Sequence, residues 1–183
     1  MNFDTDAFAH GPIESKIWLC NELARTGLDS VDNIYVLGAW SGTMPFLLHA
    51  TQPVKYSRMI LVDVNEDYLA QARVICNAID TNGQLIVLNR DANAIDYDPG
   101  QRNLIVNTSV DNIEGMSWWN RIPTGTVVAL QGRTGGHRDC VTDYQTLAEF
   151  SRAYPMLGPT IIKERQFVYP DHTYTRFMKI GMR

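Results

Sequence analysis

Short apolar runs alternate along the chain with stretches whose apolar residues recur at helical spacing. Five runs of four to six residues are rich in Val, Ile and Leu, and they cover residues 34–37, 59–64, 85–88, 104–107 and 127–131. Continuous apolar runs of this length are typical of parallel strands in a sheet that is covered on both faces. We therefore expect five parallel strands, each buried on both sides.

Helical patterns separate these runs, at 12–26, 43–51, 66–80, around 113–120 and at 142–153. Pro12 suits a first helical turn, Asn65 can cap the helix that begins at residue 66, and Thr142 or Asp143 can cap the last helix. Alternating strands and helices indicate right-handed βαβ units. After residue 158, two extended runs at 161–169 and 174–182 flank a short turn and predict an antiparallel hairpin. The pattern thus predicts one α/β domain over 1–183, with a doubly wound, mostly parallel seven-stranded sheet.

Composition narrows the classes of function. The 183 residues carry a formal net charge of −4, which disfavours a broad electrostatic grip on nucleic acid. No apolar stretch approaches the ~18 residues of a membrane span, and the first residues do not read as a signal peptide. The cysteines, Cys20, Cys76 and Cys140, form no CxxC pair, and the histidines lack metal-ligand spacing, so we expect reduced thiols, no metal and a cytoplasmic location.

A glycine turn follows the first predicted strand, and in this class of fold ligands bind beyond the carboxyl ends of the strands. The dinucleotide fingerprint GxGxxG fails here, because it needs glycine at residues 40 and 43. The spacing instead fits GxGxG with tryptophan in the middle place. A tight turn with a packed Trp would explain it equally well. The turn reads Gly38-Ala39-Trp40-Ser41-Gly42-Thr43.

Polar residues also follow the next three strands. Asp63, before Val64, has the spacing of an acid that binds a ribose diol, although it could instead cap the next helix. A carboxylate at Asp91, before Ala92, could reach the exocyclic amine of adenine or could lie in solvent. Polar residues after the fourth strand indicate a cleft or a polar turn, and they are Asn107, Thr108, Ser109, Asp111 and Asn112. Agreement at four strand ends is stronger than any one of them.

Taken together, these positions resemble a class I (Rossmann-like) S-adenosylmethionine-dependent methyltransferase, over about residues 13–182. The resemblance implies a cofactor site at the glycine turn, Asp63, Asp91-Ala92 and Asn107, with Thr108 beside the transferred methyl group. More narrowly, the chain resembles small phage-encoded members of that class, on residues 15–20, 37–42, 107–109, Trp119, 122–131 and 176–181. It departs from them where Val110-Asp111-Asn112 replaces Cys-Glu-His and where Gly132 and Arg133 replace Ser-Asn.

The resemblance implies transfer of a methyl group to a small-molecule or protein acceptor, and a homo-oligomer is possible. The DNA-methylating pattern [DN]PP[YFW] is absent after the fourth strand. No cysteine lies near that strand in the sequence, which disfavours cytosine chemistry based on a cysteine nucleophile. The glycine-rich loop 132–139 carries Arg133, His137 and Arg138, so it could close over an anionic acceptor or be an ordinary exposed loop. We consider His137 and Asp111 as catalytic candidates beside Asn107 and Thr108.

Two other functions remain open at this stage. One is a non-catalytic protein that binds S-adenosylmethionine or its product on a methyltransferase scaffold, and the departures after the fourth strand motivate it. The other is a nicotinamide-dependent oxidoreductase, which the failed GxGxxG pattern disfavours. Trp118 and Trp119 are adjacent on a predicted helix and face different ways, so we expect one in the core and the other at the border of the cleft.

Overall fold

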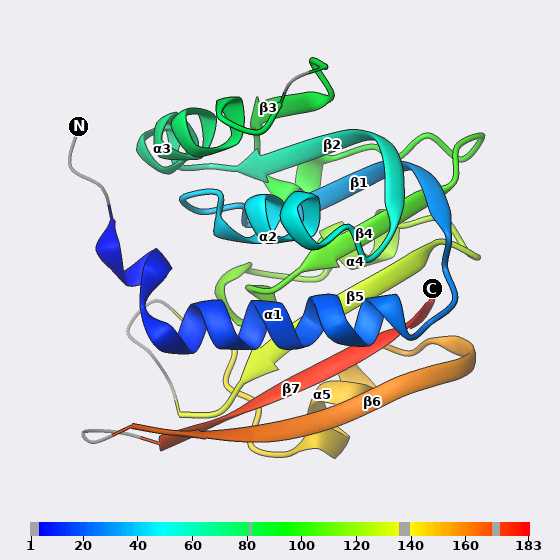
Figure 1. Ribbon diagram of the computed structural model, residues 1–183. Helices are drawn as coiled ribbons and strands as arrows, with labels where there is room; N and C mark the ends of the chain where they lie inside the picture. The colour runs from blue at the N-terminus through cyan, green and yellow to red at the C-terminus, as the bar shows by residue number, and fades with distance from the viewer. Residues whose placement is uncertain (1–3, 81, 136–139, 170–172) are drawn as a thin grey trace.

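A seven-stranded sheet forms the centre of the protein (Figure 1). The computed structural model describes residues 4–80, 82–135, 140–169 and 173–183. The strand order is β3-β2-β1-β4-β5-β7-β6; β1 to β5 are parallel, and β7 lies antiparallel to both β5 and β6. This confirms the predicted fold class. The strands are β1 Ser30–Leu37, β2 Lys55–Asp63, β3 Leu85–Asn89, β4 Asn103–Asn107, β5 Val127–Arg133, β6 Leu157–Val168 and β7 Thr173–Met182.

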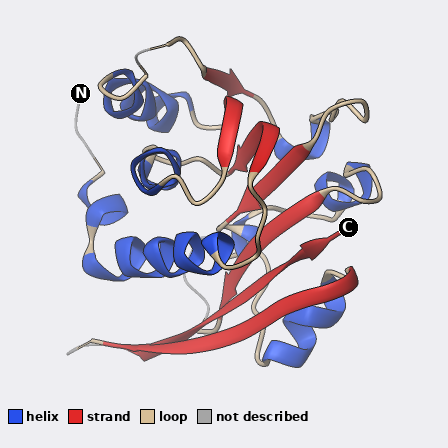
Figure 2. Ribbon diagram, turned by 45° about the vertical axis from the view of Figure 1, so that its right-hand side comes forward, coloured by secondary structure: helices blue, strands red, loops and turns tan. Residues whose placement is uncertain are grey.

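Helices cover both faces of the sheet (Figure 2). Strand residues alternate between the two layers: Leu104 and Val106 pack with α1 to α3, whereas Ile105 packs with α4 and α5. The helical segments are η1 Thr5–Phe8, α1 His10–Ala24, α2 Thr43–Thr51, α3 Glu66–Asn77, η2 Ala92–Ala94, η3 Val110–Asn112, α4 Ser117–Arg121 and α5 Leu147–Ala153. No helix of the described residues is long and apolar enough to cross a membrane.

The helix boundaries follow local caps. As predicted, Asn65 caps α3, since its side-chain oxygen accepts hydrogen bonds from the N–H groups of Asp67 and Tyr68. The prediction for the last helix was wrong: α5 begins at Leu147 and is capped by Thr146, not by Thr142 or Asp143. The backbone N–H of Thr142 instead donates to Asp111 O, which ties this segment to the loop after β4.

Two burial predictions also need correction. β3 is not covered on both faces, because it is an edge strand, and Ile86 is 37 % exposed. Trp118 and Trp119 are both in the core rather than one at the cleft, because α4 packs both rings against Tyr154. Cys20 and Cys76 are buried as free thiols, and burial raises the pKa of both, to about 11 and about 12.

Candidate functional site

A cavity of about 1080 Å³ opens at the carboxyl ends of the parallel strands. Its volume is slightly above the roughly 300–1,000 Å³ typical of small-molecule sites. Eight of the predicted cofactor-binding and catalytic residues lie in its wall, although they come from four different strand ends. These are Gly38, Trp40, Asp63, Val64, Asp91, Ala92, Thr108 and Asp111. The topology therefore brings the predicted strand-end residues to one place.

The turn between β1 and α2 has the backbone of a ligand-binding loop. Gly38 and Gly42 have φ angles of +63° and +85°, and Trp40 has a φ of +49°, which is unusual for a residue with a side chain. A Cβ on Gly42 would lie 2.9 Å from Ala72 Cα, so glycine lets this turn pack closely on α3. The Trp40 indole lines the cavity, and its Nε1 donates a hydrogen bond to Asp4 Oδ2 at 2.8 Å.

Asp63 at the end of β2 is anchored to this turn. Its Oδ2 accepts the backbone N–H of Trp40 at 2.9 Å, and its Oδ1 accepts that of Asn65 at 2.9 Å. Each carboxylate oxygen has about two lone-pair sites, so one acceptor site remains on each oxygen. Since Asn65 supplies the cap of α3, Asp63 is not the capping residue. The side chain is half-buried in the cavity wall, where a diol can be bound.

Asp91 and Ala92 lie at the start of η2, on the side of the cavity formed by β2 and β3. Asp91 Oδ1 accepts the N–H of Asn93 at 2.8 Å and also its side-chain amide, while Oδ2 has no hydrogen bond with a described residue. Ala92 is buried and also contributes to the wall. An exposed carboxylate oxygen beside a small apolar residue suits a flat ring that carries an amine.

The residues after β4 divide into a buried support and a cavity wall. Asn107 is fully buried, and its Oδ1 accepts the N–H of Ser109 at 2.9 Å. Thr108 and Asp111 line the cavity. Asp111 is 3 % exposed; its Oδ2 accepts a hydrogen bond from Cys140 Sγ at 3.3 Å, and its Oδ1 is buried with no described hydrogen-bond partner. Asp111 thus holds, in the cavity wall, a buried acceptor oxygen that no described residue satisfies.

Some predicted site residues do not form the wall. Ala39, Gly42, Thr43 and Asn107 are buried and do not line the cavity, so any role in binding goes through the neighbours they position. His137, the other catalytic candidate, lies outside the described residues.

The sequence interpretation missed several residues of this cavity. Cys140 lies far from β4 in the chain, yet its thiol contacts Asp111, so the expectation that no cysteine lies near the fourth strand is wrong in space. Lys16 from α1 and Arg176 and Tyr174 from β7 also line the cavity. The sequence signal that would have found part of this group is a charged residue in a strand, since Arg176 is one of two cations in β7 and the other is Lys179.

Burial and charge both act on Lys16. Its side chain is 6 % exposed, with Nζ at 5.5 Å from the centre of the Trp40 ring. Desolvation, and then the positive charge of Arg176, lower the pKa of Lys16 from 10.5 to about 7. Perturbed groups that line a cleft are functional candidates. Lys16, beside Trp40, and Arg176 are therefore cations of the cavity wall that the strand-end motifs did not indicate.

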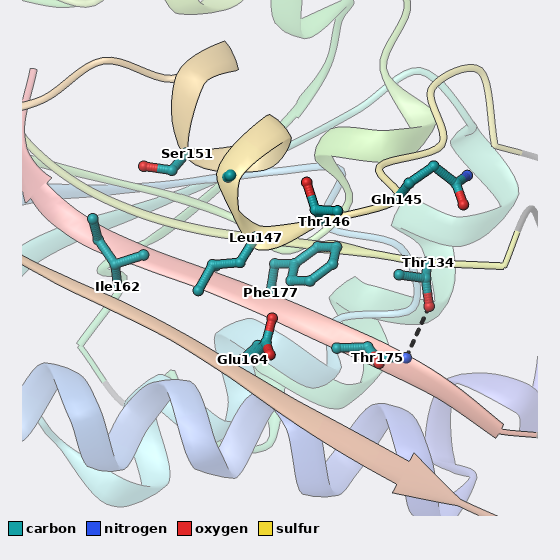
Figure 3. A pocket seen from close by; sticks show the side chains of 10 residues that line it. Thr134, Gln145, Thr146, Leu147, Ser151, Ile162, Glu164, Thr175 and Phe177 are labelled. Atoms are coloured by element: carbon teal, nitrogen blue, oxygen red, sulfur yellow. Dashed lines mark hydrogen bonds between the residues drawn. The ribbon is translucent and has the colours of Figure 1, made fainter.

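A second hollow, of about 730 Å³, lies between α5 and the β6–β7 hairpin (Figure 3). In Figure 3, Leu147, Ile162 and Phe177 form its apolar part, and the N–H of Thr175 donates to Thr134 Oγ1 at 2.9 Å. Glu164 is the ionisable residue of its lining. This second hollow contains none of the predicted cofactor-binding or catalytic residues, so we place the chemistry in the larger cavity.

The fold, compared with solved structures, is that of class I methyltransferases. Magnesium protoporphyrin IX methyltransferase from Synechocystis PCC 6803, with bound SAM (S-adenosylmethionine), is similar with a TM-score of 0.65 and 12 % identity over 99 % of this chain and 85 % of that one. An rRNA methylase from Streptococcus thermophilus has a TM-score of 0.57 and 12 % identity, covering 93 % and 96 %. The cyclopropane synthase MmaA2 from Mycobacterium tuberculosis has a TM-score of 0.54 and 17 % identity, covering 69 % and 44 %.

No protein-family model matches the sequence, and no curated protein matches it significantly. At such identities the likeness shows the fold alone. The similar structures differ in what their names say they act on, so the acceptor must be argued from the cavity of this chain.

Proposed function

We propose that this chain binds S-adenosylmethionine at the ends of β1, β2 and β3 and transfers its methyl group to a small-molecule or protein acceptor at the ends of β4, β5 and β7. The observation that carries this proposal is Asp63, whose two oxygens are fixed by the Trp40 and Asn65 N–H groups and still have acceptor sites facing the cavity. The similar fold with bound SAM supports the choice of cofactor.

The residues present fit this cofactor. Asp63 would hold the ribose hydroxyls, and Asp91 with Val64 and Ala92 would hold the adenine, while the Gly38–Gly42 turn gives the backbone close approach. Bound there, S-adenosylmethionine would supply an electrophilic methyl group to the acceptor, with S-adenosylhomocysteine as the leaving group. The protein then mainly has to orient the acceptor and exclude water. Asn107 keeps the loop after β4 in place through the Ser109 N–H.

Asp111 is the proposed proton acceptor. Its Oδ1 is buried in the cavity wall without a described hydrogen-bond partner, so it can take a proton at that atom when the acceptor has one to lose. Cys140 keeps the other oxygen in place through its thiol. We keep His137 as a candidate for the same task, because the sequence places it in the loop after β5.

The first test is cofactor binding by thermal melting and calorimetry. Saturation at 100 times the dissociation constant should add roughly 2.7 kcal/mol, or about 5–10 °C in Tm, with S-adenosylmethionine or S-adenosylhomocysteine and not with NADH. Asp63→Ala should weaken binding by about 10- to 150-fold, because hydrogen bonds to a charged group contribute roughly 1.5–3 kcal/mol.

Asp67→Ala is the matched control. Asp67 lies four residues further on, is exposed, and does not line the cavity, so its loss removes the same charge without touching the site. We expect it to change the affinity by less than about twofold. An Asp63→Ala protein that binds as tightly as the Asp67→Ala protein would remove Asp63 from the site, and a larger shift with NADH would favour the oxidoreductase.

A further inference from the structure

The cavity wall opposite the proposed nucleoside site carries two arginines that face each other. Arg133 in β5 and Arg176 in β7 are register partners in the antiparallel pair, so they lie directly opposite and on the same face of the sheet. Both line the cavity. Both guanidinium groups lie over the Tyr174 ring, with Cζ at 5.0 Å and 5.8 Å from its centre.

These two cations lack anionic partners among the residues that the structure describes. No ion pair includes either one, and the Nε of each is buried without a hydrogen-bond acceptor. Arg176 is only 8 % exposed. Like charges placed directly opposite each other in a sheet are destabilising, and buried charges are normally paired. Stacking on Tyr174 offsets part of this cost but leaves the buried Nε–H of each arginine unsatisfied.

The position of the pair separates it from the proposed cofactor residues. β5 lies three strands away from β2 in the sheet order, which is about 14 Å at a strand spacing of ~4.8 Å, and β7 is one strand further. Asp63 and Asp91 therefore lie at the opposite end of the cavity from Arg133 and Arg176. Between the two ends lie Thr108 and Asp111, where we place the transfer.

We propose that Arg133 and Arg176 bind an anionic oxygen group, a carboxylate or a phosphate, of a small-molecule methyl acceptor. The planar guanidinium presents its donors in a fork that matches two oxygens of either group, and two forks converging from neighbouring strands suit one oxyanion between them. This inference rests on the proposed function, because it takes the other end of the cavity as the cofactor site. It narrows the acceptor to anionic small molecules.

The test uses anions on protein already saturated with S-adenosylhomocysteine. Inorganic phosphate and benzoate are titrated in separate arms, to about 50 mM, against sodium chloride of equal ionic strength. We expect one of them to raise Tm by about 3–6 °C at ten times its dissociation constant. The arm that responds tells phosphate from carboxylate. In the Arg133→Gln/Arg176→Gln variant the shift should disappear, while the affinity for S-adenosylhomocysteine changes by less than about twofold.

Arg152→Gln is the control, because Arg152 lies exposed on α5 and outside the cavity. It should keep the anion shift of the wild type. If the double variant does not fold, Arg133→Gln alone should weaken the anion about tenfold, since Arg133 is only half-buried.

Three outcomes would overturn the inference while leaving the cofactor assignment in place: no anion shift, a shift that persists without the two arginines, or an RNA oligonucleotide that displaces the small anion from them. A double variant that loses S-adenosylhomocysteine, or phosphate that competes with it, would assign the pair to the cofactor and also overturn the inference. Absence of S-adenosylhomocysteine binding in the wild type is a separate result, which contradicts the proposed function itself.

Discussion

Helix α1 carries two buried charges that are treated in opposite ways. Glu22, near its C-terminal end, is 3 % exposed, and its oxygens pair with Lys163 Nζ at 2.7 Å and Arg25 Nη1 at 2.8 Å. Lys16, six residues earlier, is 6 % exposed and makes no ion pair with a described residue. The two residues lie at different ends of the sheet: in Figure 1 the first turns of α1 are at the carboxyl ends of the parallel strands, and the last turns are at the other end.

The contrast separates stabilising charges from charges exposed to a ligand. The two cations that pair with Glu22 offset the cost of removing its carboxylate from water. The ion pair with Lys163 also links α1 to β6. A buried lysine beside a buried arginine has no such compensation, and the cost is visible in its lowered pKa of about 7. Such a cost is expected where the fold is arranged for binding rather than for its own stability.

Glu22→Gln should give the largest loss of stability. The amide keeps the shape but removes the charge that two cations share, so we expect the free energy of unfolding to fall by about 2–3 kcal/mol. The value is below that of a fully buried pair, because Lys163 and Arg25 are 44 % and 68 % exposed and remain solvated. Urea unfolding measures it. Glu164→Gln, at an exposed position of β6, is the control, and an equal effect there would contradict the special role of Glu22.

Lys16→Met should increase the free energy of unfolding at neutral pH, whereas Glu22→Gln decreases it. Replacing an unpaired buried charge with an apolar side chain is often stabilising, and we expect about 1–2 kcal/mol at pH 7. The charged and titratable side chains that share its surroundings are Arg176 from β7 and Asp4 and Asp6 from the N-terminal segment.

The pH dependence of this variant follows from the lowered pKa. Between about pH 7 and 10.5 the unfolded chain keeps the Lys16 proton that the folded chain has lost, so the unfolding free energy of the wild type rises with pH relative to the variant. The advantage of Lys16→Met should therefore shrink from pH 7 toward pH 10. Urea unfolding of both proteins at several pH values measures it, and a difference that is constant with pH would show that Lys16 is not buried as a charge.

Features set by local sequence could be predicted, and features set by long-range contacts could not. The strands were predicted correctly because continuous apolar runs have few alternative interpretations. The residues of the proposed cofactor site were singled out because Gly38 directly follows the first run, Asp63 lies near the end of the second, and Asp91 comes three residues after the third. The start of α5 was not found, since Thr142, Asp143 and Thr146 are all good caps, and only the contact of Thr142 with Asp111 O decides among them.

The cations of the cavity wall could be predicted only in part. Arg133 was noticed because it follows the fifth strand. Lys16 and Arg176 come from opposite ends of the chain, and only the folded structure brings them to the same cavity. Lys16 reads as an ordinary position of an amphipathic helix. Its burial depends on packing between α1 and β7, which no local pattern encodes.

The smallest predicted effects concern the two partners of Glu22. Arg25→Gln and Lys163→Gln should each cost only about 0.5 kcal/mol, because each is partly exposed and the other cation still neutralises the carboxylate. Together they should cost about 2 kcal/mol, more than the sum, since the double variant leaves Glu22 buried and unpaired. A double-mutant cycle in urea measures this coupling. If the losses of the two single variants simply added up, Glu22 would be stable in the folded protein without either cation. The contrast between the two ends of α1 would then rest on Lys16 alone.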